Sequence, residues 1–224
     1  MRFPLTLTTA MVGYIAKNKI RRKRRFPLVL MLEPLHACNL TCTGCGRIRE
    51  YETTIKQKLS VEECVASSEE CGAPIVSICG GEPMIYPEIG RLVSELLRRR
   101  RHIILCTNGM FIQKRLHEFK PTSRFFFNVH LDGLEDTHDR AVEREGVFRA
   151  AIEGIGHAGI AGQQIGQQGI GPVADGVADT ETGAQLVDQG LRHLGHFHFQ
   201  HHLLRRGHGH HIDDLRRDDQ FAGG

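Results

Sequence analysis

The stretch PLVLMLEPLHACNLTCTGC, residues 27–45, decides the fold. Its residues 28–32 form a continuous apolar run that ends at Glu33-Pro34. Such a run is typical of a strand buried on both faces in a parallel sheet. Cys38, Cys42 and Cys45 follow in the loop after it. Three thiolates in one loop can hold three irons of a cubane cluster and leave the fourth iron open to an outside ligand.

Zinc and disulfides are the alternatives for these cysteines. A structural zinc site needs four ligands, and His36 would complete the set only in an unusual arrangement. Disulfides fit poorly, because the seven cysteines are an odd number. The other four lie in apolar periodic segments, where free thiols are ordinary, and they are Cys64, Cys71, Cys79 and Cys106. With no secretion signal or membrane-length apolar run, we expect a cytoplasmic protein.

The chain downstream repeats a strand–loop–helix pattern. Further apolar runs predict strands over 75–79, 103–106 and 125–131. Helices are expected from Val61, after the capping box of Ser60 and Glu63, from Pro87, and over about 111–119. Four such units in succession predict a parallel α/β sheet with right-handed crossovers, open or barrel-like.

Polar motifs follow the predicted strands at their carboxyl ends. They are Gly80-Gly81-Glu82-Pro83, Thr107-Asn108-Gly109 and His130-Leu131-Asp132-Gly133. Alone, each is ordinary, because a Gly-Gly-Glu-Pro run is usually a turn and a single His is more often a core residue. Parallel strands bring their carboxyl ends to one edge, so the motifs and the cysteines are predicted to share one rim.

These motifs together resemble those of the radical S-adenosylmethionine (SAM) enzymes. Residues 38–45 match that family's CxxxCxxC, and residues 80–83 match its GGEP motif. More narrowly, residues 27–34, 71–74 and 130–133 resemble the hopanoid-biosynthesis branch, the adenosylhopane synthases. The resemblance covers about residues 1–155 and implies a partial (β/α) barrel.

The resemblance implies a 4Fe-4S cluster on the three cysteines, with SAM as co-substrate. Gly80, Gly81 and Glu82 would hold the methionine amino group, with Glu82 as a charge partner of the ammonium. The carboxylate and ribose would lie near four further residues, Thr107, Asn108, His130 and Asp132.

In the hopanoid branch, the 5'-deoxyadenosyl radical adds to the exocyclic double bond of a C30 hopene, diploptene. The product radical needs a hydrogen atom, and Cys106 at the end of the third strand is our candidate donor. A buried, merely packing thiol is the alternative. We expect a flavodoxin or ferredoxin as electron donor. A radical SAM enzyme with another substrate, and a truncated, non-catalytic iron–sulfur or metal-binding fragment, remain alternatives.

Basic charge is concentrated at the N-terminus. Eight cations precede the first acid, Glu33, so the rest of the chain carries a net −5 against the total of +3. A run such as 21–25 is most often solvated, with anionic lipid as the next reading and nucleic acid, which we do not expect, as the third. Residues 1–26 read as a basic amphipathic segment. Its apolar residues predict either a peripheral membrane contact of residues 1–25, at the inner face of the membrane, or packing on the protein body.

The composition changes sharply near residue 154. Residues 154–224 hold 15 of the 25 glycines and 9 of the 14 histidines but none of the cysteines. We therefore divide the chain into a core of four visible β/α units over 27–155 and a Gly/His/Gln-rich tail over 156–224. The tail is expected to be non-native or disordered, as after a truncation or frameshift near residue 154. Its histidines suggest metal binding or a compositional accident.

Overall fold

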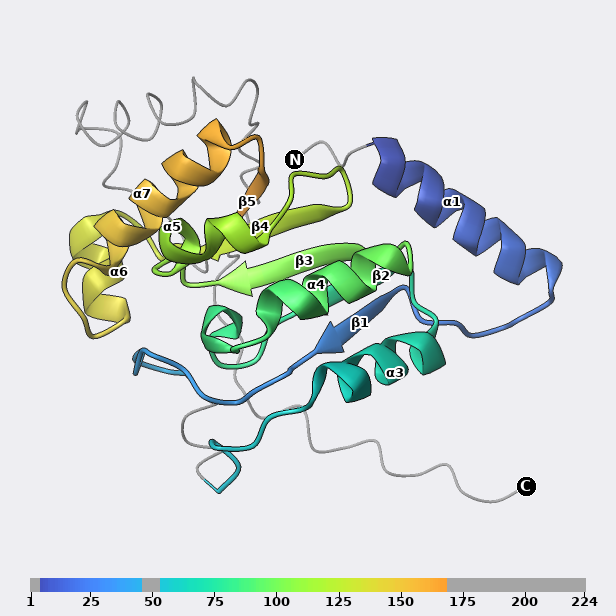
Figure 1. Cartoon of the computed structure of the whole chain (residues 1–224), viewed down its shortest axis with the longest axis horizontal. Coiled ribbons are helices and arrows are strands. Elements are labelled where there is room, and N and C mark those ends of the chain that lie inside the picture. The colour runs from blue at the N-terminus through green and yellow to red at the C-terminus, as the bar shows by residue number, and fades with distance from the viewer. Residues whose placement is uncertain (1–4, 46–52, 169–224) are drawn as a thin grey trace, which may run out of the picture.

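The computed structural model describes residues 5–45 and 53–168 of the chain. These residues form a five-stranded sheet in the order β1-β2-β3-β4-β5, in which neighbouring strands all pair in parallel (Figure 1). The strands are β1 Val29–Leu32, β2 Ile75–Ile78, β3 His102–Thr107, β4 Phe125–His130 and β5 Gln164–Gln168. The α/β fold with a parallel sheet, predicted from the sequence, is confirmed.

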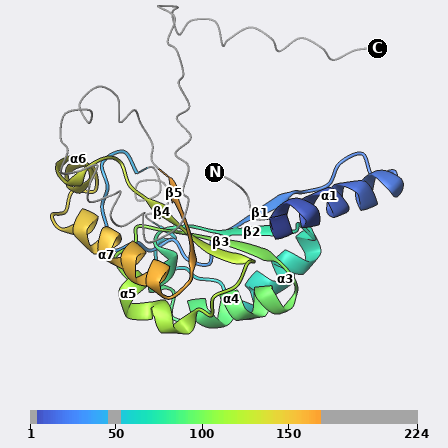
Figure 2. The ribbon, with the colours of Figure 1, turned by 90° about the horizontal axis from the view of Figure 1, so that it is seen from above.

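Helices cover one face of this sheet. Those on that face are α3 Val61–Cys71, α4 Ile89–Arg98, α5 Ile112–Arg115 and α7 Val147–Ile160 (Figure 2). The 3-10 turns η1 Pro83–Ile85 and η2 Leu116–Glu118 flank α4 and α5. Helix α6, Glu135–Ala141, lies beside the arrowhead ends of the strands, and α1, Leu5–Ile20, lies beyond their starting ends.

Local sequence signals fix where α3 begins and ends. The Ser60 hydroxyl accepts from the backbone N–H of Glu63, whose carboxylate accepts from the N–H of Ser60 at 2.7 Å. This is the predicted capping box, which satisfies two otherwise unpaired donors. Gly72 ends the helix in the left-handed region at φ 68°.

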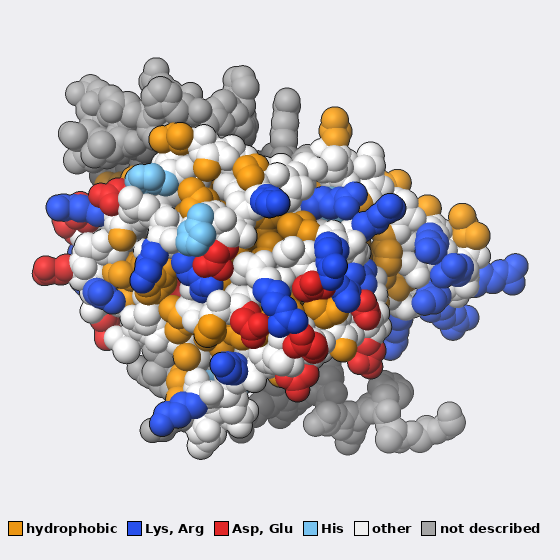
Figure 3. Space-filling model, in the orientation of Figure 1, with side chains coloured by type: hydrophobic (Ala, Val, Ile, Leu, Met, Phe, Trp, Pro, Cys, Tyr) orange, Lys and Arg blue, Asp and Glu red, His pale blue; other side chains and the backbone are white. Residues whose placement is uncertain are grey.

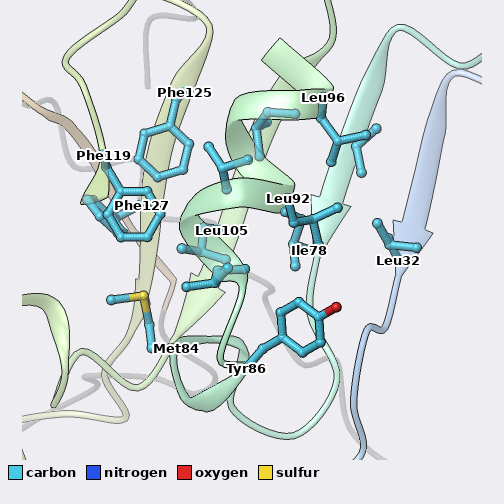
Figure 4. Close-up of a cluster of buried hydrophobic side chains, with 14 of the residues drawn as sticks. Leu32, Ile78, Met84, Tyr86, Leu92, Leu96, Leu105, Phe119, Phe125 and Phe127 are labelled. Atoms are coloured by element: carbon cyan, nitrogen blue, oxygen red, sulfur yellow. The ribbon is translucent and has the colours of Figure 1, made fainter. Parts of the chain in front are cut away.

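The core lies between the sheet and these helices. Side chains at alternate strand positions point into it, among them Leu32, Ile78, Leu105, Phe125 and Phe127, and they meet Leu92 and Leu96 of α4 (Figure 4). The rings of Phe125 and Phe127 pack with Phe119, with centroids 4.9–5.3 Å apart. The opposite strand positions form a second sheet face that none of α3, α4, α5 and α7 covers, here called the open face.

Two predicted helices differ in detail. The helix expected from Pro87 begins at Ile89, because Tyr86 to Glu88 first make a tight turn in which the Ile89 N–H donates to the Tyr86 carbonyl at 3.2 Å. The helix expected over 111–119 is divided into α5 and η2.

The α/β pattern continues past residue 154, where the sequence analysis expects it to end. Helix α7 runs to Ile160 and β5 pairs with β4 from Phe126↔Gln164 to His130↔Gln168. The expectation of only four visible units is therefore wrong, and the core extends into what we assigned to the tail. The strand was missed because four of its five residues are glutamine or glycine, so it has no apolar run. The remainder of the predicted tail, 169–224, lies outside the described residues.

Helix α1 packs one of its faces on the body of the protein. Its buried and half-buried positions are Leu7, Ala10, Met11, Tyr14, Ile15 and Asn18, which recur with helical spacing. The Thr6 hydroxyl donates to the carbonyl of Ser123, just before β4, at 3.4 Å. Among residues 5–45 and 53–168, every helix is too short or too polar to span a membrane.

Candidate functional site

The cysteine loop leaves β1 and is held against α6. The backbone N–H of Thr43 donates to the Ala141 carbonyl at 2.9 Å, and its hydroxyl donates to the Glu143 carboxylate at 2.7 Å. Cys38 and Cys42 pack against a small cluster of buried apolar side chains formed by Leu40, Val142 and Val147. The loop therefore has a fixed seat at the carboxyl ends of the strands, as predicted.

The diglycine after β2 is clamped to the backbone that leads into this loop. The N–H of Gly81 donates to the Leu35 carbonyl at 3.2 Å, and the N–H of Glu82 donates to the Ala37 carbonyl at 2.9 Å. A Cβ on Gly81 would lie 1.9 Å from the Ala37 oxygen, so only glycine permits this approach. We expected the diglycine to approach a ligand closely, and it also approaches the residue before Cys38.

The Glu82 side chain turns inward. Its carboxylate is 1% exposed and accepts from Met84 N at 2.8 Å, the Thr107 hydroxyl at 2.7 Å and Asn108 N at 2.8 Å. Burial raises the pKa of Glu82, and these three hydrogen bonds oppose that rise. The sequence analysis expects Glu82 to be a charge partner of the methionine ammonium, and that role stays a prediction. Glu82 also joins the turn after β2 to the turn after β3.

Asn108 continues this connection to the cysteine loop. Its side-chain N–H donates to the side-chain oxygen of Asn39 at 2.9 Å, and its own oxygen accepts from Met110 N at 3.1 Å. Thr107, in contrast, is buried, and its hydroxyl is engaged by Glu82 and by the N–H of Gly109. Asn108 thus contacts the cysteine loop directly, whereas Thr107 is buried and is connected to the loop through Glu82 and the backbone of the turn.

His130 and Asp132 lie together after β4, as expected. His130 Nε2 is 2.8 Å from Asp132 Oδ1. On the other side, the backbone N–H of Asp132 donates to Nδ1 of His138 at 3.1 Å. His138 is fully buried, and burial lowers its pKa. The neutral His138 ring therefore accepts this bond and fixes the position of Asp132.

Cys106 lies on the open face of the sheet, not in the core. Its neighbours on β3, Leu105 and Thr107, are buried on the helix side, whereas Cys106 is half-buried. The Sγ atom is 3.5 Å from Ser77 Oγ and 3.6 Å from Asn128 Nδ2. Cys106 is therefore half-buried on the open face, whereas Cys64 is fully buried in the core.

Three thiols on one loop suit a cubane iron–sulfur cluster. All seven cysteines are free thiols. Among the described residues, no three His, Cys, Asp or Glu side chains converge as ligands of one ion would. His36, the alternative fourth zinc ligand, has its Nδ1 2.9 Å from the Thr54 hydroxyl. Cubane thiolates each bind a different iron and need no such convergence.

The thiols of this loop are costly to ionise without metal. Burial raises the pKa of Cys38. Burial, together with the neighbouring Cys38 and Cys45, raises the pKa of Cys42 to about 11. Iron bonding stabilises the thiolate form directly, so a bound cluster would offset this cost.

A parallel α/β sheet with three free cysteines on a fixed loop, rimmed by glycine, amide and carboxylate groups, defines an iron–sulfur, cofactor-binding enzyme core. Residues 32–169 match the family model described as Radical SAM superfamily. The chain belongs to the Radical SAM superfamily, and membership implies SAM and an iron–sulfur cluster as cofactors.

Two curated relatives are similar to part of the chain. Fe-coproporphyrin III synthase of Methanosarcina barkeri is 27% identical over 58% of this chain and 33% of its own length. GTP 3',8-cyclase of Petrotoga mobilis is 30% identical over 53% of this chain and 38% of its own length. The chain therefore spans less than two fifths of the length of either relative.

A solved structure shares the fold. Streptococcus suis SuiB, crystallised with SAM, superposes with a TM-score of 0.59 at 17% identity, covering 80% of this chain and 39% of that protein. At this identity, the likeness concerns the fold alone.

Three residues of the site were missed by the sequence analysis. They are Asn39, which bonds to Asn108, His138, which holds Asp132, and Glu143, which holds Thr43. Asn39 stands between two cysteines and was open to prediction. His138 and Glu143 carry no sequence signal, because only the folded chain brings them to their partners.

Proposed function

We propose that this chain forms the SAM-cleaving part of an enzyme that transfers a 5'-deoxyadenosyl group to a C30 hopene such as diploptene. The observation that carries the proposal is the position of Cys106. Its thiol faces the open side of the sheet, one residue before the Thr107-Asn108 turn that is connected to the cysteine loop. Addition of the radical to a double bond requires a hydrogen-atom donor, because the substrate radical that it leaves must be quenched.

The open face also suits an apolar substrate. The cross-strand register places Met31, Ser77, Ile104 and Phe126 in one row. Met31 is 61% exposed and Val29 is 43% exposed, and both lie on the strand at this sheet edge. Exposed apolar side chains on the same sheet favour a hydrocarbon over a polar nucleotide.

The cluster and SAM, when bound, supply the 5'-deoxyadenosyl radical. Its addition to the exocyclic carbon forms a carbon–carbon bond and leaves a tertiary carbon radical on the substrate. The Cys106 S–H bond then breaks, and its hydrogen atom quenches that radical. The resulting sulfur radical returns to the thiol by taking one electron and one proton. A flavodoxin or ferredoxin would supply the electron.

The residues of the rim would position SAM and exclude water from it. The Asn39–Asn108 bond would hold the cysteine loop beside the SAM methionine moiety, while Gly80 and Gly81 leave backbone carbonyls for its amino group. His130 and Asp132 would bind near the carboxylate and ribose. We also propose that residues 1–25 bring the enzyme to the cytoplasmic face of a membrane, where its lipid substrate resides.

A deuterium experiment tests the reaction. The full chain, reconstituted anaerobically with iron and sulfide, is incubated with dithionite, SAM and diploptene in D₂O. We expect adenosylhopane carrying one deuterium, because thiol hydrogens exchange with solvent. Cys106→Ala should still release 5'-deoxyadenosine but form little adenosylhopane. Cys79→Ala, a matched thiol change directly after the neighbouring strand β2, should retain the product.

Other outcomes select the alternatives. Deoxyadenosine without adenosylhopane would favour a radical SAM enzyme with another substrate, which the names of the relatives support. A cluster that forms without either product would identify a non-catalytic fragment. Undeuterated adenosylhopane, or full product from Cys106→Ala, would overturn the role of Cys106.

A further inference from the structure

A basic groove lies at the end of the sheet opposite the cysteines. Its volume is about 290 Å³, and it is bounded by the end of α1, the turn after it and residues 70–72 at the end of α3. Figures 1 and 2 place α1 at the starting ends of the strands, away from α6 and the arrowheads. The groove is therefore remote from the cysteine loop.

The lining of this groove is strongly cationic. Lys17, Arg21, Lys23 and Arg25 line it, with Glu70 as its one carboxylate. Within the part of the chain that the structure describes, none of the four cations forms a salt bridge. Figure 3 shows Lys and Arg side chains gathered at this end of the molecule. Like charges gathered without partners repel one another, so an anion placed among them would be stabilised.

Helix dipoles explain only part of this charge. Lys17 and Arg21 lie at the C-terminal end of α1, where a cation is favoured. Lys23 and Arg25 lie beyond that end and gain nothing from it. The end of α3 already has a cation, because Arg101 donates to the carbonyls of Ser68 and Ala73 at 3.0 Å.

The groove is shaped by ordered, partly buried groups. Asn18 is 6% exposed. Its side-chain amide donates to the Tyr14 carbonyl at 2.9 Å, and its backbone carbonyl accepts from the N–H of Lys23 at 3.0 Å. Arg22 adopts a left-handed φ of 55°, which turns the chain back toward the sheet. The rings of Tyr14 and Phe26 meet edge to face, with centroids 5.7 Å apart. The cations are thus held by a fixed turn, not by a loose tail.

Helix α1 presents a row of apolar side chains to solvent, from Leu5 at its start to Ile20 at the end that borders the groove. Leu5, Val12 and Ile20 are 83%, 61% and 82% exposed, and they share one side of the helix. A surface helix with exposed apolar residues and an adjoining basic cluster is the pattern of interfacial lipid binding.

We propose that the groove binds the phosphate group of an anionic phosphate ester, and that the apolar row identifies a glycerophospholipid headgroup as its source. A free phosphate ester is the other source of the same chemistry. This inference rests on the proposed membrane contact and gives that contact a specific site. It does not depend on the adenosyl transfer.

Paired charge variants test the groove. Lys23→Gln/Arg25→Gln removes two cations that line the groove, and Lys19→Gln/Arg24→Gln removes two from the same segment that do not line it. Co-sedimentation of the full chain with phosphatidylglycerol or phosphatidylcholine vesicles measures lipid binding. Calorimetric titration with glycerol 3-phosphate measures binding of the soluble ester.

We expect the chain to bind phosphatidylglycerol but not phosphatidylcholine vesicles. The groove variant should bind at least about tenfold more weakly, while the control variant stays within about threefold. Saturable glycerol 3-phosphate binding that only the groove variant loses, without vesicle binding, would support the site with a soluble source and refute the membrane contact.

Equal losses in both variants would mean that the segment attracts membranes through its total charge, which keeps the contact and refutes the groove. No binding to vesicles or ester would refute both. Circular dichroism of each variant checks that the fold is retained. Deoxyadenosine formation should be the same in all, because the groove is remote from the cysteines.

Discussion

Asn108 at the end of β3 and Asn39 between the first two cysteines are joined side chain to side chain, with 2.9 Å between nitrogen and oxygen. This bond ties the turn of a central strand directly to the cluster-binding loop. Through Asn108 N and the Glu82 carboxylate, the connection continues to the turn after β2. Two rigid strands therefore hold the loop.

The first prediction concerns this bond. Asn108→Ala removes the link, so the loop should hold a reconstituted cluster less firmly. We expect fewer irons per chain and several-fold faster bleaching of the cluster absorbance in the presence of a chelator. Gln113→Ala removes an exposed amide that lies within hydrogen-bonding distance of His157, and this variant should bind iron like the wild type. Equal cluster lifetimes in all three proteins would contradict the assigned role.

The second prediction concerns the buried carboxylate. Thr107→Val preserves shape but removes the hydroxyl that donates to Glu82 at 2.7 Å. Because the carboxylate is fully buried, losing a donor should cost about 1–3 kcal/mol of unfolding free energy. Urea unfolding measures this cost. The control Thr9→Val removes an exposed hydroxyl within α1 and should stay within about 0.5 kcal/mol. If Thr107→Val lowered the free energy of unfolding by no more than the control does, the bond between Thr107 and Glu82 would be dispensable.

The third prediction concerns pH. Burial lowers the pKa of His138 and, together with Arg124, that of His102, from the ordinary 6.5. The unfolded chain therefore binds these protons at higher pH than the folded chain. The contribution of these two histidines to the free energy of unfolding is fully present above about pH 6.5 and is lost as the pH falls toward their folded pKa values. Each histidine lowers the free energy of unfolding by at most about 1.4 kcal/mol per pH unit.

Urea unfolding between pH 7.5 and 5.5 tests that sign. His138→Gln should reduce the slope, because one of the two buried groups is removed, while the amide oxygen can still accept from Asp132 N. A slope that is unchanged by the substitution would contradict the assignment. The contribution of Glu82, whose raised pKa has the opposite sign, is present in both proteins and does not enter this comparison.

The fourth prediction concerns the turn after β3. Gly109 has a φ of +84°, and a Cβ there would lie 2.9 Å from Ala151 Cβ and 3.0 Å from Val129 Cγ1. Gly109→Ala combines backbone strain with crowding and should cost roughly 2–5 kcal/mol. Gly146 has a similar φ of +80° but open space around it. Gly146→Ala should therefore cost only about 1–2 kcal/mol, and equal losses of stability in the two variants would rule out crowding.

Much of the core was predictable because its signals are local. The capping box of Ser60 and Glu63, the stop at Gly72 and the apolar runs of β1 to β4 depend on neighbouring residues in the chain. Strand β5 was not predictable in this way. Its pairing with β4 satisfies backbone groups, which requires no apolar side chains.

The motif positions were predictable, but the role of each side chain was not. Gly81 and Glu82 occur in one motif, yet Gly81 contacts the loop backbone while the Glu82 carboxylate points to Thr107 and Asn108. Which way a side chain faces depends on strand parity and on distant partners. Strand parity likewise places Cys106 on the open face. The contribution of His138 was not predictable, because it depends on a partner, Asp132, that only the fold brings to it.

The sequence by itself determined the family and its cofactors, the parallel α/β class and the rim on which the motifs meet, because spacing along the chain and strand direction suffice for these. Only the tertiary structure decided that Glu82 is an internal clamp, that α1 packs on the body and shapes a basic groove, and that the sheet has a fifth strand. These features depend on contacts between residues far apart in the chain, and such contacts arise only when burial and hydrogen bonding are satisfied together.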